Sequence, residues 1–366
     1  MLDKNIVKAL LDWYHMNART LPWRENQEPY RVWVSEIMLQ QTRVEAVIPY
    51  FLRFMNVLPT IEALAEVDEE QLHKLWEGLG YYSRVRNLQK AAKVICEEYQ
   101  GKIPSEHEQI LKLPGIGPYT AGAISSIAFG QPKAAIDGNV LRVMTRVLAD
   151  DTDINNMTFR KEMGSWLEEI YPEGQCGDFT QSLIELGALI CVPNAEPKCD
   201  QCPISAYCKA RQEERQLQFP VKQPKKKRKI QDMTVFLMEK DDSIAICKRP
   251  DSGLLAGLWQ FPNVDGVLKV QEALDWVAEQ GIAVSRTDGI IEEPEKKHVF
   301  THIEWHMHVY RIQCEKYREK LGMIEKSDEQ DIGECENPAE KLEWVKKEKL
   351  DAEIALPTAF RKLLVK

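Results

Sequence analysis

The sequence predicts a multidomain protein in which an all-α region precedes a smaller α+β domain. The chain has 366 residues, more than a single hydrophobic core usually organises. Its first 212 residues carry apolar side chains at helical spacing. After a basic stretch, the remainder contains short segments that alternate polar and apolar residues with the period of β-strands.

The all-α region is expected to span residues 1–212. Segments such as VWVSEIMLQQ, QLHKLWEGL and LQKAAKVICEEY place apolar residues three and four positions apart, which is typical of amphipathic helices. Two capping boxes predict helix starts, one formed by Ser105 with Glu108 and the other by Asp68 with Gln71.

A polar and then basic stretch, residues 213–230, ends in QPKKKRKI and is interpreted as a linker that also contacts phosphates. A nuclear import tract is the alternative interpretation of this composition.

The α+β domain is expected to span residues 231–366. TVFLMEK, SIAICKR and IEWHMHVYRI predict strands in it, and EALDWVAEQ predicts a helix.

Composition and charge bound the class of protein. A hydrophobic content of 44% with 29% charged residues is ordinary for a globular protein, and the chain has no run of about 18 apolar residues that predicts a membrane span. No export signal is recognisable, so a cytoplasmic location is expected. Residues 1–230 carry 29 basic and 30 acidic side chains, against 19 and 27 in residues 231–366. The nearly neutral first part can bind DNA if its cations share one face.

A short Gly/Pro hairpin, LPGIGPYT, lies between helical stretches. Gly115 and Gly117 lack the Cβ atoms that would keep a phosphate away from the backbone, and Pro118 suits the first position of the next helix. Free amide groups at a helix N-terminus bind anions, and such a contact with DNA carries no sequence information. An ordinary corner between two helices is the alternative.

Four of the nine cysteines lie within eighteen residues, at Cys191, Cys199, Cys202 and Cys208. In a protein that is not exported, reduced thiols or metal ligands are expected in place of disulfides. Four thiolates at the spacing C-x7-C-x2-C-x5-C suit either tetrahedral zinc or a cubane iron–sulfur cluster. The spacing alone does not choose between them.

Together, the helical region, the hairpin, Asp137 in AAIDGN and the cysteines resemble the helix-hairpin-helix DNA glycosylases of the endonuclease III superfamily, and specifically the MutY family of adenine DNA glycosylases. The likeness covers nearly the whole chain. It implies a helix-hairpin-helix glycosylase region, built from a six-helix module and an iron–sulfur cluster module, followed by a Nudix-like recognition domain. It also implies that the four cysteines hold one [4Fe-4S] cluster. Here seven residues separate Cys191 from Cys199, where the family usually has six.

The resemblance implies a monofunctional glycosylase of base excision repair that works as a monomer on the nucleoid. Bifunctional relatives carry a lysine just after the hairpin, which forms a Schiff base with the sugar. This chain has Tyr119 there, and a phenol cannot form an imine, so little or no lyase activity is expected. The implied partner is double-stranded DNA with adenine mispaired with 8-oxoguanine or guanine, and the adenine is flipped out before hydrolysis.

The chemistry requires two carboxyl groups with different roles. A general acid must protonate adenine, at N7 in this family, and a carboxylate must face the cationic sugar. Glu36 matches the family's acid, and burial on its apolar helix should raise its pKa. Asp137 matches the second carboxylate and precedes a helix, where amide dipoles should keep it ionised, although a simple N-cap is the alternative. Asn139 should orient Asp137 or the water, and Tyr119 should shield the intermediate.

Flipping a base leaves a gap in the duplex that a side chain must fill. Gln41 and Tyr81 match the family's wedge positions, and Thr42 in the same LQQTR segment is also expected to contact DNA. Trp23 and Leu39 are candidates for lining the base pocket, with ordinary core packing as the alternative.

The C-terminal part contains KRPDSGLLAGLWQFP, which resembles the segment before the catalytic box of Nudix pyrophosphatases. The box itself is missing, because VLKVQEALDWVAEQG offers Glu272 and Glu279 at the wrong spacing for a divalent metal. A domain that recognises a ligand and does not hydrolyse it is therefore expected. The resemblance to the MutY family implies that the ligand is 8-oxoguanine, read through Phe300, Thr301 and His302 of HVFTH. The family usually has serine in place of Thr301, which keeps the hydroxyl group. An exposed His-rich strand is the alternative.

Three other functions compete with this interpretation. A bifunctional lyase acting on oxidised pyrimidines would produce β-elimination products. A non-catalytic DNA-binding iron–sulfur protein would tolerate changes at Glu36 and Asp137. A Nudix hydrolase would release phosphate or pyrophosphate from nucleoside triphosphates.

Overall fold

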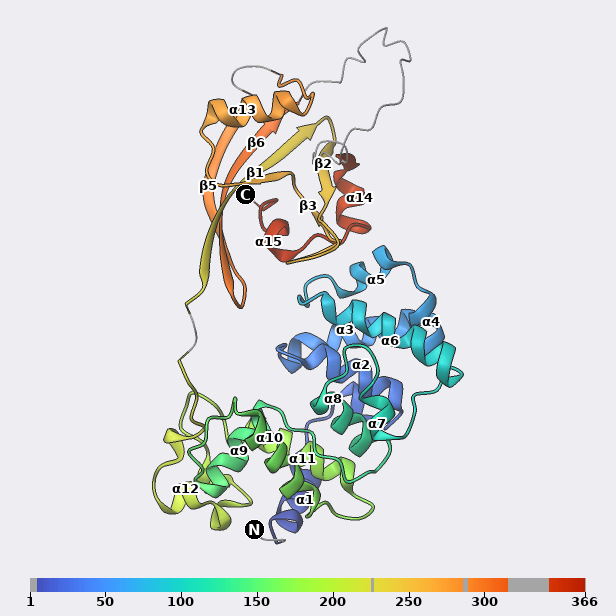
Figure 1. Ribbon diagram of the computed structural model, residues 1–366, viewed down its shortest axis with the longest axis vertical. Helices are drawn as coiled ribbons and strands as arrows, with labels where there is room; N and C mark the ends of the chain where they lie inside the picture. Colours follow the sequence, from blue (N-terminus) through green and yellow to red (C-terminus); the bar gives the residue numbers. More distant parts are fainter. Residues whose placement is uncertain (1–4, 225–226, 286–288, 315–341, 366) are drawn as a thin grey trace. The chain divides into compact units, whose positions relative to one another are not determined.

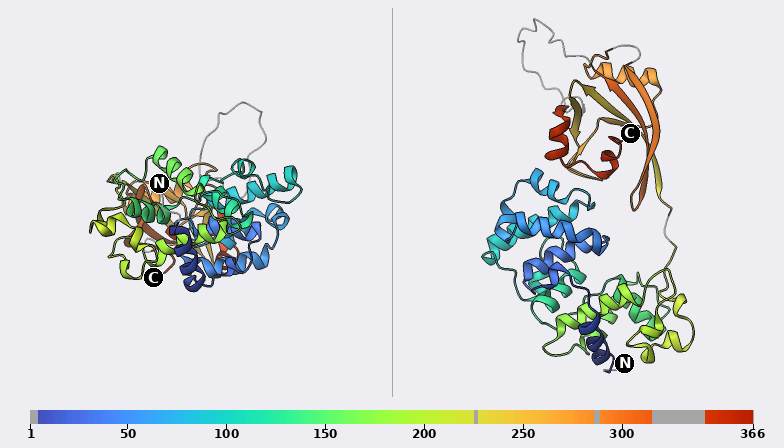
Figure 2. Two further views of the ribbon diagram at one scale, coloured as in Figure 1. Left: turned by 90° about the horizontal axis from the view of Figure 1, so that it is seen from below. Right: turned by 180° about the vertical axis from the view of Figure 1, so that it is seen from behind.

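The computed structural model describes residues 5–224, 227–285, 289–314 and 342–365 (Figures 1 and 2). Its contacts divide the chain into two compact units. The first comprises Met1–Asp68 with Tyr81–Lys225, and the second comprises Glu69–Gly80 with Lys226–Lys366. The main division falls inside the expected basic linker, two of whose residues, Lys225 and Lys226, lie outside the described residues.

The first unit is all-α, as the sequence predicts. Among the described residues, no helix combines the length and apolar character that a membrane span requires. The helices of this unit are α1 (Asn5–Asn17), η1 (Pro22–Arg24), α2 (Pro29–Leu39), α3 (Val44–Val57), α4 (Ile61–Glu66), α6 (Ser83–Tyr99), α7 (His107–Ile110), α8 (Pro118–Ala123), η2 (Ile124–Ala128), α9 (Gly138–Leu148), α10 (Met157–Glu168), α11 (Cys176–Leu189), η3 (Cys199–Gln201), η4 (Ser205–Tyr207), α12 (Lys209–Gln212) and η5 (Gln216–Gln218).

Helix α2 is buried along most of its length, which places the predicted acid Glu36 inside the protein. The helix begins where the Glu28 carboxylate accepts hydrogen bonds from the first free amide groups and Pro29 occupies the first turn. Elsewhere in the unit, α1, α9, α10 and α11 share a core that includes Leu10, Met144 and Phe179.

Helix starts around the hairpin agree only partly with the sequence analysis. Pro118 is the first residue of α8, with Gly117 at the N-cap, as predicted. The capping box expected at Ser105 is wrong. Helix α7 begins two residues later, at His107, and Glu106 takes the extended N-cap position without a side-chain hydrogen bond.

The second unit contains a mixed sheet and its covering helices. In the described residues the sheet follows the order β3-β2-β1-β6-β5, with β4 paired to β1 and β7 paired to β2. Strands β1 and β6 are parallel and the other pairs are antiparallel. The elements are α5 (Glu69–Trp76), β1 (Lys229–Lys240), β2 (Ser243–Lys248), β3 (Trp259–Gln260), β4 (Asn263–Asp265), α13 (Val270–Glu279), β5 (Ile290–Val299), β6 (Ile303–Gln313), β7 (Glu343–Lys346), α14 (Lys347–Ala352) and α15 (Thr358–Arg361).

Alternate residues of strand β1 enter two different cores, because successive side chains of a strand point to opposite faces. Val235 and Leu237 pack with Phe360 of α15 on one face. Phe236 and Met238 pack with residues of α13 on the other. Figure 1 shows these helices on opposite sides of the sheet.

Helix α5 is coded within the helical region but is held by the C-terminal part of the second unit. Glu70 and Lys74 are one turn apart on this helix. The Glu70 carboxylate pairs with Lys248 at 2.6 Å and accepts a hydrogen bond from the Trp259 indole at 2.9 Å. The Lys74 ammonium donates to the backbone carbonyl of Asp351 at 2.7 Å.

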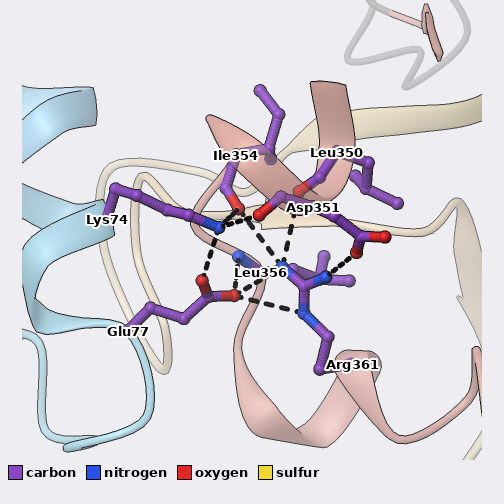
Figure 3. Close-up of polar contacts among 7 residues, drawn as sticks. All are labelled: Lys74, Glu77, Leu350, Asp351, Ile354, Leu356 and Arg361. Carbon is purple, nitrogen blue, oxygen red and sulfur yellow. Dashed lines mark hydrogen bonds and ion pairs between the residues drawn. The ribbon is translucent and has the colours of Figure 1, made fainter. Parts of the chain in front are cut away.

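Glu77 extends the same face of the segment, and Figure 3 shows it between Lys74 and Arg361. Its Oε1 atom accepts hydrogen bonds from Arg361 Nη2 at 2.6 Å and from the Leu356 amide at 3.1 Å. Arg361 Nη1 pairs with Asp351 at 2.5 Å. Partly buried charge pairs of this kind fix position more than they add stability.

Candidate active site

One large cavity of the first unit, about 1510 Å³, brings the predicted catalytic residues together. They reach it from the middle of α2, the first turn of α8 and the start of α9. Of the residues named from the sequence, its lining includes Glu36, Tyr119, Asp137, Asn139, Gln41, Thr42, Gly115, Gly117, Trp23 and Leu39.

Glu36 has the environment of a general acid. Its residue surface is only 7% exposed. Burial raises the pKa of Glu36 to about 7, helped by repulsion from Asp137 and opposed by the Tyr119 hydrogen bond and by Arg24. A large fraction of Glu36 is therefore protonated near neutral pH, which an unperturbed glutamic acid would not be.

Tyr119 contacts that acid directly. Its hydroxyl donates a hydrogen bond of 2.6 Å to Oε2 of Glu36. Burial raises the pKa of Tyr119 well above its usual range, and the nearby Glu36 and Asp137 charges raise it further. The phenol therefore remains a donor throughout the physiological pH range.

Asp137 is the N-cap of α9, as the alternative interpretation of this residue had it, and it also faces the cavity. Its Oδ1 atom accepts hydrogen bonds from the backbone amides of Asn139 at 2.8 Å and Val140 at 2.7 Å. These amides at the helix terminus favour the charged form, as expected, but they are not the largest influence on the pKa of Asp137. Burial is the largest influence and raises the pKa of Asp137, although these hydrogen bonds and Arg142 oppose the shift.

Asn139 is held in one orientation relative to Asp137. Its Nδ2 atom donates to Asp137 Oδ2 at 2.6 Å, and its Oδ1 atom accepts from Arg142 Nη2 at 2.9 Å. Gly187 of α11 permits this packing, because a Cβ atom there would lie 2.6 Å from Asn139 Cβ. The Arg142 guanidinium also donates to the backbone carbonyl of Cys191 at 2.7 Å.

Three charged residues of the cavity wall were not identified from the sequence. Glu185 is fully buried and forms ion pairs of 2.9 Å with both Arg19 and Arg24. Burial would raise the pKa of Glu185, but the two arginines lower it to about 2. This cluster places cations beside the cavity. No local sequence motif predicts it, because Glu185 is more than 160 positions from each arginine.

The two hairpin glycines differ in what a side chain at each position would contact. Gly115 has φ 74°, and a Cβ atom there would lie 2.5 Å from Asn87 Cβ, so packing within the protein already requires glycine. Gly117 has open space where a Cβ would project. The open space at Gly117 suits the expected role of admitting a phosphate to the backbone.

The two predicted wedge residues share an unusual backbone. Gln41 and Tyr81 have φ values of 58° and 49°, in the left-handed region that residues other than glycine rarely adopt. Both side chains are exposed, Tyr81 to 46%. Such conformations concentrate at functional sites because the surrounding structure must maintain them.

The four clustered cysteines line one small cavity, together with Arg146 of α9 and Arg211 of α12. Arg146 Nη1 donates to the Cys191 sulfur at 3.2 Å. Burial, helped by repulsion from the neighbouring thiols, raises the pKa of Cys202 to about 12, so its thiolate forms at neutral pH only when a cationic centre stabilises it. No group of three His, Cys, Asp or Glu side chains in the described ranges is arranged to hold a single metal ion. All four thiols nevertheless line the same cavity, and thiolates are the ligands that zinc and iron–sulfur centres take.

The segment expected to read 8-oxoguanine forms the turn between β5 and β6 of the second unit. The Phe300 amide donates to the Ile303 carbonyl at 2.8 Å, which closes the turn and leaves Thr301 and His302 exposed. The Phe300 ring packs against Trp305, with centroids 4.8 Å apart. In the same unit, Glu272, one of the two glutamates considered above for a Nudix metal site, accepts a hydrogen bond from the Lys269 amide and caps the start of α13.

Comparisons with known proteins agree with this architecture. Residues 34–169 match the HhH-GPD superfamily of base excision DNA repair proteins, and residues 234–366 match the NUDIX domain family. A solved thermostable thymine-DNA glycosylase is 29% identical, with a TM-score of 0.53, and the match covers 57% of this chain and 96% of that one.

Curated relatives extend the likeness across both units. The human adenine DNA glycosylase is 35% identical over 84% of this chain and 66% of its own length. The adenine DNA glycosylase of Buchnera aphidicola subsp. Baizongia pistaciae is also 35% identical, over 81% of this chain and 82% of its own length. The predicted fold, a helix-hairpin-helix region followed by a Nudix-like domain, is confirmed, and the chain belongs to the adenine DNA glycosylase family.

Proposed function

We propose that this protein hydrolyses the N-glycosidic bond of adenine in duplex DNA where adenine is mispaired with 8-oxoguanine or guanine. The observation that carries the proposal is that Glu36 and Asp137 line the same cavity in different hydrogen-bonding environments. One can donate a proton near neutral pH, and the other is surrounded by donors that favour its charged form.

In the proposed reaction, Glu36 donates its proton to N7 of adenine. The electrons of the bond between C1′ and N9 leave with the base, and Asp137 faces the positive charge that develops on the sugar. Water then attacks C1′, and its proton returns to Glu36. The products are free adenine and an abasic site, and Tyr119 supplies no amine for strand cleavage.

DNA engages the hairpin and the two wedge residues in this proposal. Gly117 admits a backbone phosphate, and Gln41 and Tyr81 fill the space left by the extruded adenine. The exposure and left-handed backbone of both wedge residues support this role. Thr42 lies beside Gln41 and lines the same cavity.

The second unit is proposed to recognise the base opposite adenine. Thr301 and His302 are exposed on a closed turn, and Phe300 anchors that turn against Trp305. The Thr301 hydroxyl can bond to the oxidised edge of 8-oxoguanine. Glu272 is engaged as a helix cap, which argues against the alternative of metal-dependent Nudix hydrolysis.

Cys191, Cys199, Cys202 and Cys208 are proposed to hold one [4Fe-4S] cluster. When bound, such a cluster would tie together the loop that follows α11 and leave the reaction at Glu36 and Asp137 unchanged. Absorption at about 400 nm distinguishes an iron–sulfur cluster from a zinc ion, which does not absorb there. A colourless protein with stoichiometric zinc would contradict the cluster.

Incubation of the purified protein with a labelled duplex that carries adenine opposite 8-oxoguanine tests the activity. We expect strand breaks only after alkali treatment, because alkali cleaves abasic sites. Breaks without alkali would favour the bifunctional lyase. Intact strands after alkali, with duplex still bound, would favour a non-catalytic DNA-binding protein.

A further inference from the structure

Arg84, near the start of α6, contacts the segments of Gln41 and Tyr81, which are among several described non-glycine residues with a left-handed backbone. Its backbone amide donates to the Tyr81 carbonyl at 2.8 Å. Its side chain is half-buried and reaches the end of α2, which leads directly into Gln41. One arginine therefore touches both segments that carry the proposed wedge residues.

The contact with α2 is a cap on its C-terminus. Arg84 Nη1 donates to the carbonyls of Ile37 at 2.8 Å, Met38 at 3.1 Å and Gln40 at 2.6 Å. The last carbonyls of a helix lack partners within the helix, and a cation there is favoured by the helix dipole. Helices that end in a left-handed residue normally use glycine, but here that residue is Gln41.

The contact with Tyr81 is a cation–π interaction. The Arg84 guanidinium carbon lies 5.4 Å from the centroid of the Tyr81 ring. Burial lowers the pKa of Arg84 to about 10, so its charge persists at neutral pH. Planarity and several donors let an arginine stack on a ring and serve carbonyls at the same time, which a lysine cannot do.

We propose that Arg84 is a positioning residue that joins Gln41 and Tyr81 into one rigid wedge. The inference rests on the proposed function, because it assumes that these two side chains enter the duplex. Arg84 itself need not touch DNA. A wedge set in place before binding loses little freedom on insertion, so more of the binding energy can be used to unstack the adenine.

The full-length Arg84→Lys variant tests this role with two substrates. One is the duplex with adenine opposite 8-oxoguanine, and the other keeps this pair but flanks it with mismatched base pairs, which already weaken the stacking of the adenine. We expect single-turnover adenine release to slow about 10- to 100-fold on the first and within about threefold on the second. Equal slowing on both substrates, or no slowing on either, overturns the proposal.

A fluorescence measurement separates this inference from the proposed activity. A 2-aminopurine beside the target adenine brightens when the stack opens, with or without hydrolysis. We expect the wild-type chain to brighten it and Arg84→Lys to brighten it less. An equal signal from both proteins, or no signal from the wild type, overturns the proposal. Failure of the wild type to release adenine would instead count against the proposed function alone.

Two further variants guard against an effect of folding. Arg53→Lys is the matched control, because the Arg53 guanidinium stacks at 4.7 Å on the ring of Tyr50, which is not a proposed wedge residue, and it should leave both measurements unchanged. In a Tyr81→Leu background, Arg84→Lys should cause a smaller loss of unstacking signal than in the wild type. An equal loss of unstacking signal in both backgrounds would show that Arg84→Lys destabilises the protein generally. It would overturn the proposed coupling between Arg84 and Tyr81.

Discussion

The Tyr119 hydroxyl and the Glu36 carboxyl group share a hydrogen bond of 2.6 Å across the cavity. Burial is the main cause of the raised pKa of Glu36, and this bond moderates it. The proton of the proposed acid is therefore controlled by two residues that are 83 positions apart in the chain. The pH dependence of base release should report on both of them.

Base release by the wild-type chain should fall as pH rises through about 7, because Glu36 must be protonated to act as an acid. Above that pH the single-turnover rate should drop about tenfold per pH unit. The measurement uses saturating protein with adenine opposite 8-oxoguanine. A rate that stays constant up to about pH 9 would exclude Glu36 as the acid.

Tyr119→Phe should move this pH midpoint upward, because it removes a hydrogen bond that lowers the pKa of Glu36. The same pH series on the variant measures the shift. Tyr171→Phe is a matched control, because the Tyr171 hydroxyl instead pairs with Thr180 at 2.8 Å. Its midpoint should equal that of the wild type, and a downward shift for Tyr119→Phe would contradict the assignment.

Glu36→Gln should abolish adenine release and stabilise the protein at alkaline pH. The folded pKa of about 7 lies above the reference value of 4.5, so the stability that the neutral form provides is complete below about pH 4.5 and is lost as pH rises through about 7. Glutamine has no charge to bury. Urea unfolding should show a gain of up to about 3 kcal/mol at pH 8 and a smaller gain at pH 5. A loss of stability at pH 8 would contradict the burial argument.

Asp137→Asn should also abolish adenine release while duplex binding is retained. The asparagine oxygen can still accept the amide hydrogen bonds that cap α9. Its amide nitrogen, however, would face the Asn139 Nδ2 donor, whose orientation Arg142 fixes. We expect a loss of at least about 100-fold in single-turnover rate. Substantial activity would show that the carboxylate charge is dispensable.

Arg361→Ala should destabilise the second unit, because it removes the hydrogen bonds to Glu77 shown in Figure 3. Both side chains are partly exposed, so we expect a loss of about 1–2 kcal/mol. Lys349→Ala is the control, since its pair with Glu353 is mostly exposed and should contribute less than about 0.5 kcal/mol. Equal effects of the two changes in urea unfolding would contradict a structural role for Arg361.

Thr301→Ala should reduce the preference for adenine opposite 8-oxoguanine over adenine opposite guanine. Loss of one hydrogen bond predicts a decrease of about 2- to 10-fold in the ratio of the two rates. Thr301→Ser keeps the hydroxyl and should keep the ratio. If all three proteins discriminate equally, the turn between β5 and β6 does not read the opposite base.

Much of the fold could be predicted because its elements carry strong local patterns. The strands around TVFLMEK, SIAICKR and IEWHMHVYRI and the helix at EALDWVAEQ all appear near their expected positions. Strand β5 could not be predicted, since IIEEPEKKHV is charged and contains proline. It ends the main strand order, where one side of a strand needs no partner, and its pairing shifts between Glu293 and Lys296, on either side of that proline.

The candidate site likewise contains residues that local sequence patterns predict and residues that they do not. Glu36, Tyr119 and Asp137 were found because each lies in a recognisable segment, and the structure brings all three to one cavity. Arg84 and Glu185 act through partners remote in sequence, which no local pattern encodes. The effect of burial on the pKa of Asp137 could not be predicted, because burial depends on elements that pack over this residue.

Helix α5 has a practical consequence for dissecting this protein. It is coded between α4 and α6, yet its charged face and the adjacent Glu77 have their partners at Lys248, Asp351 and Arg361. A fragment that stops at the linker would keep the helix and lose all of those partners. A single scission therefore cannot yield two self-sufficient halves, and each proteolytic or recombinant piece would need α5 redesigned or supplied in trans.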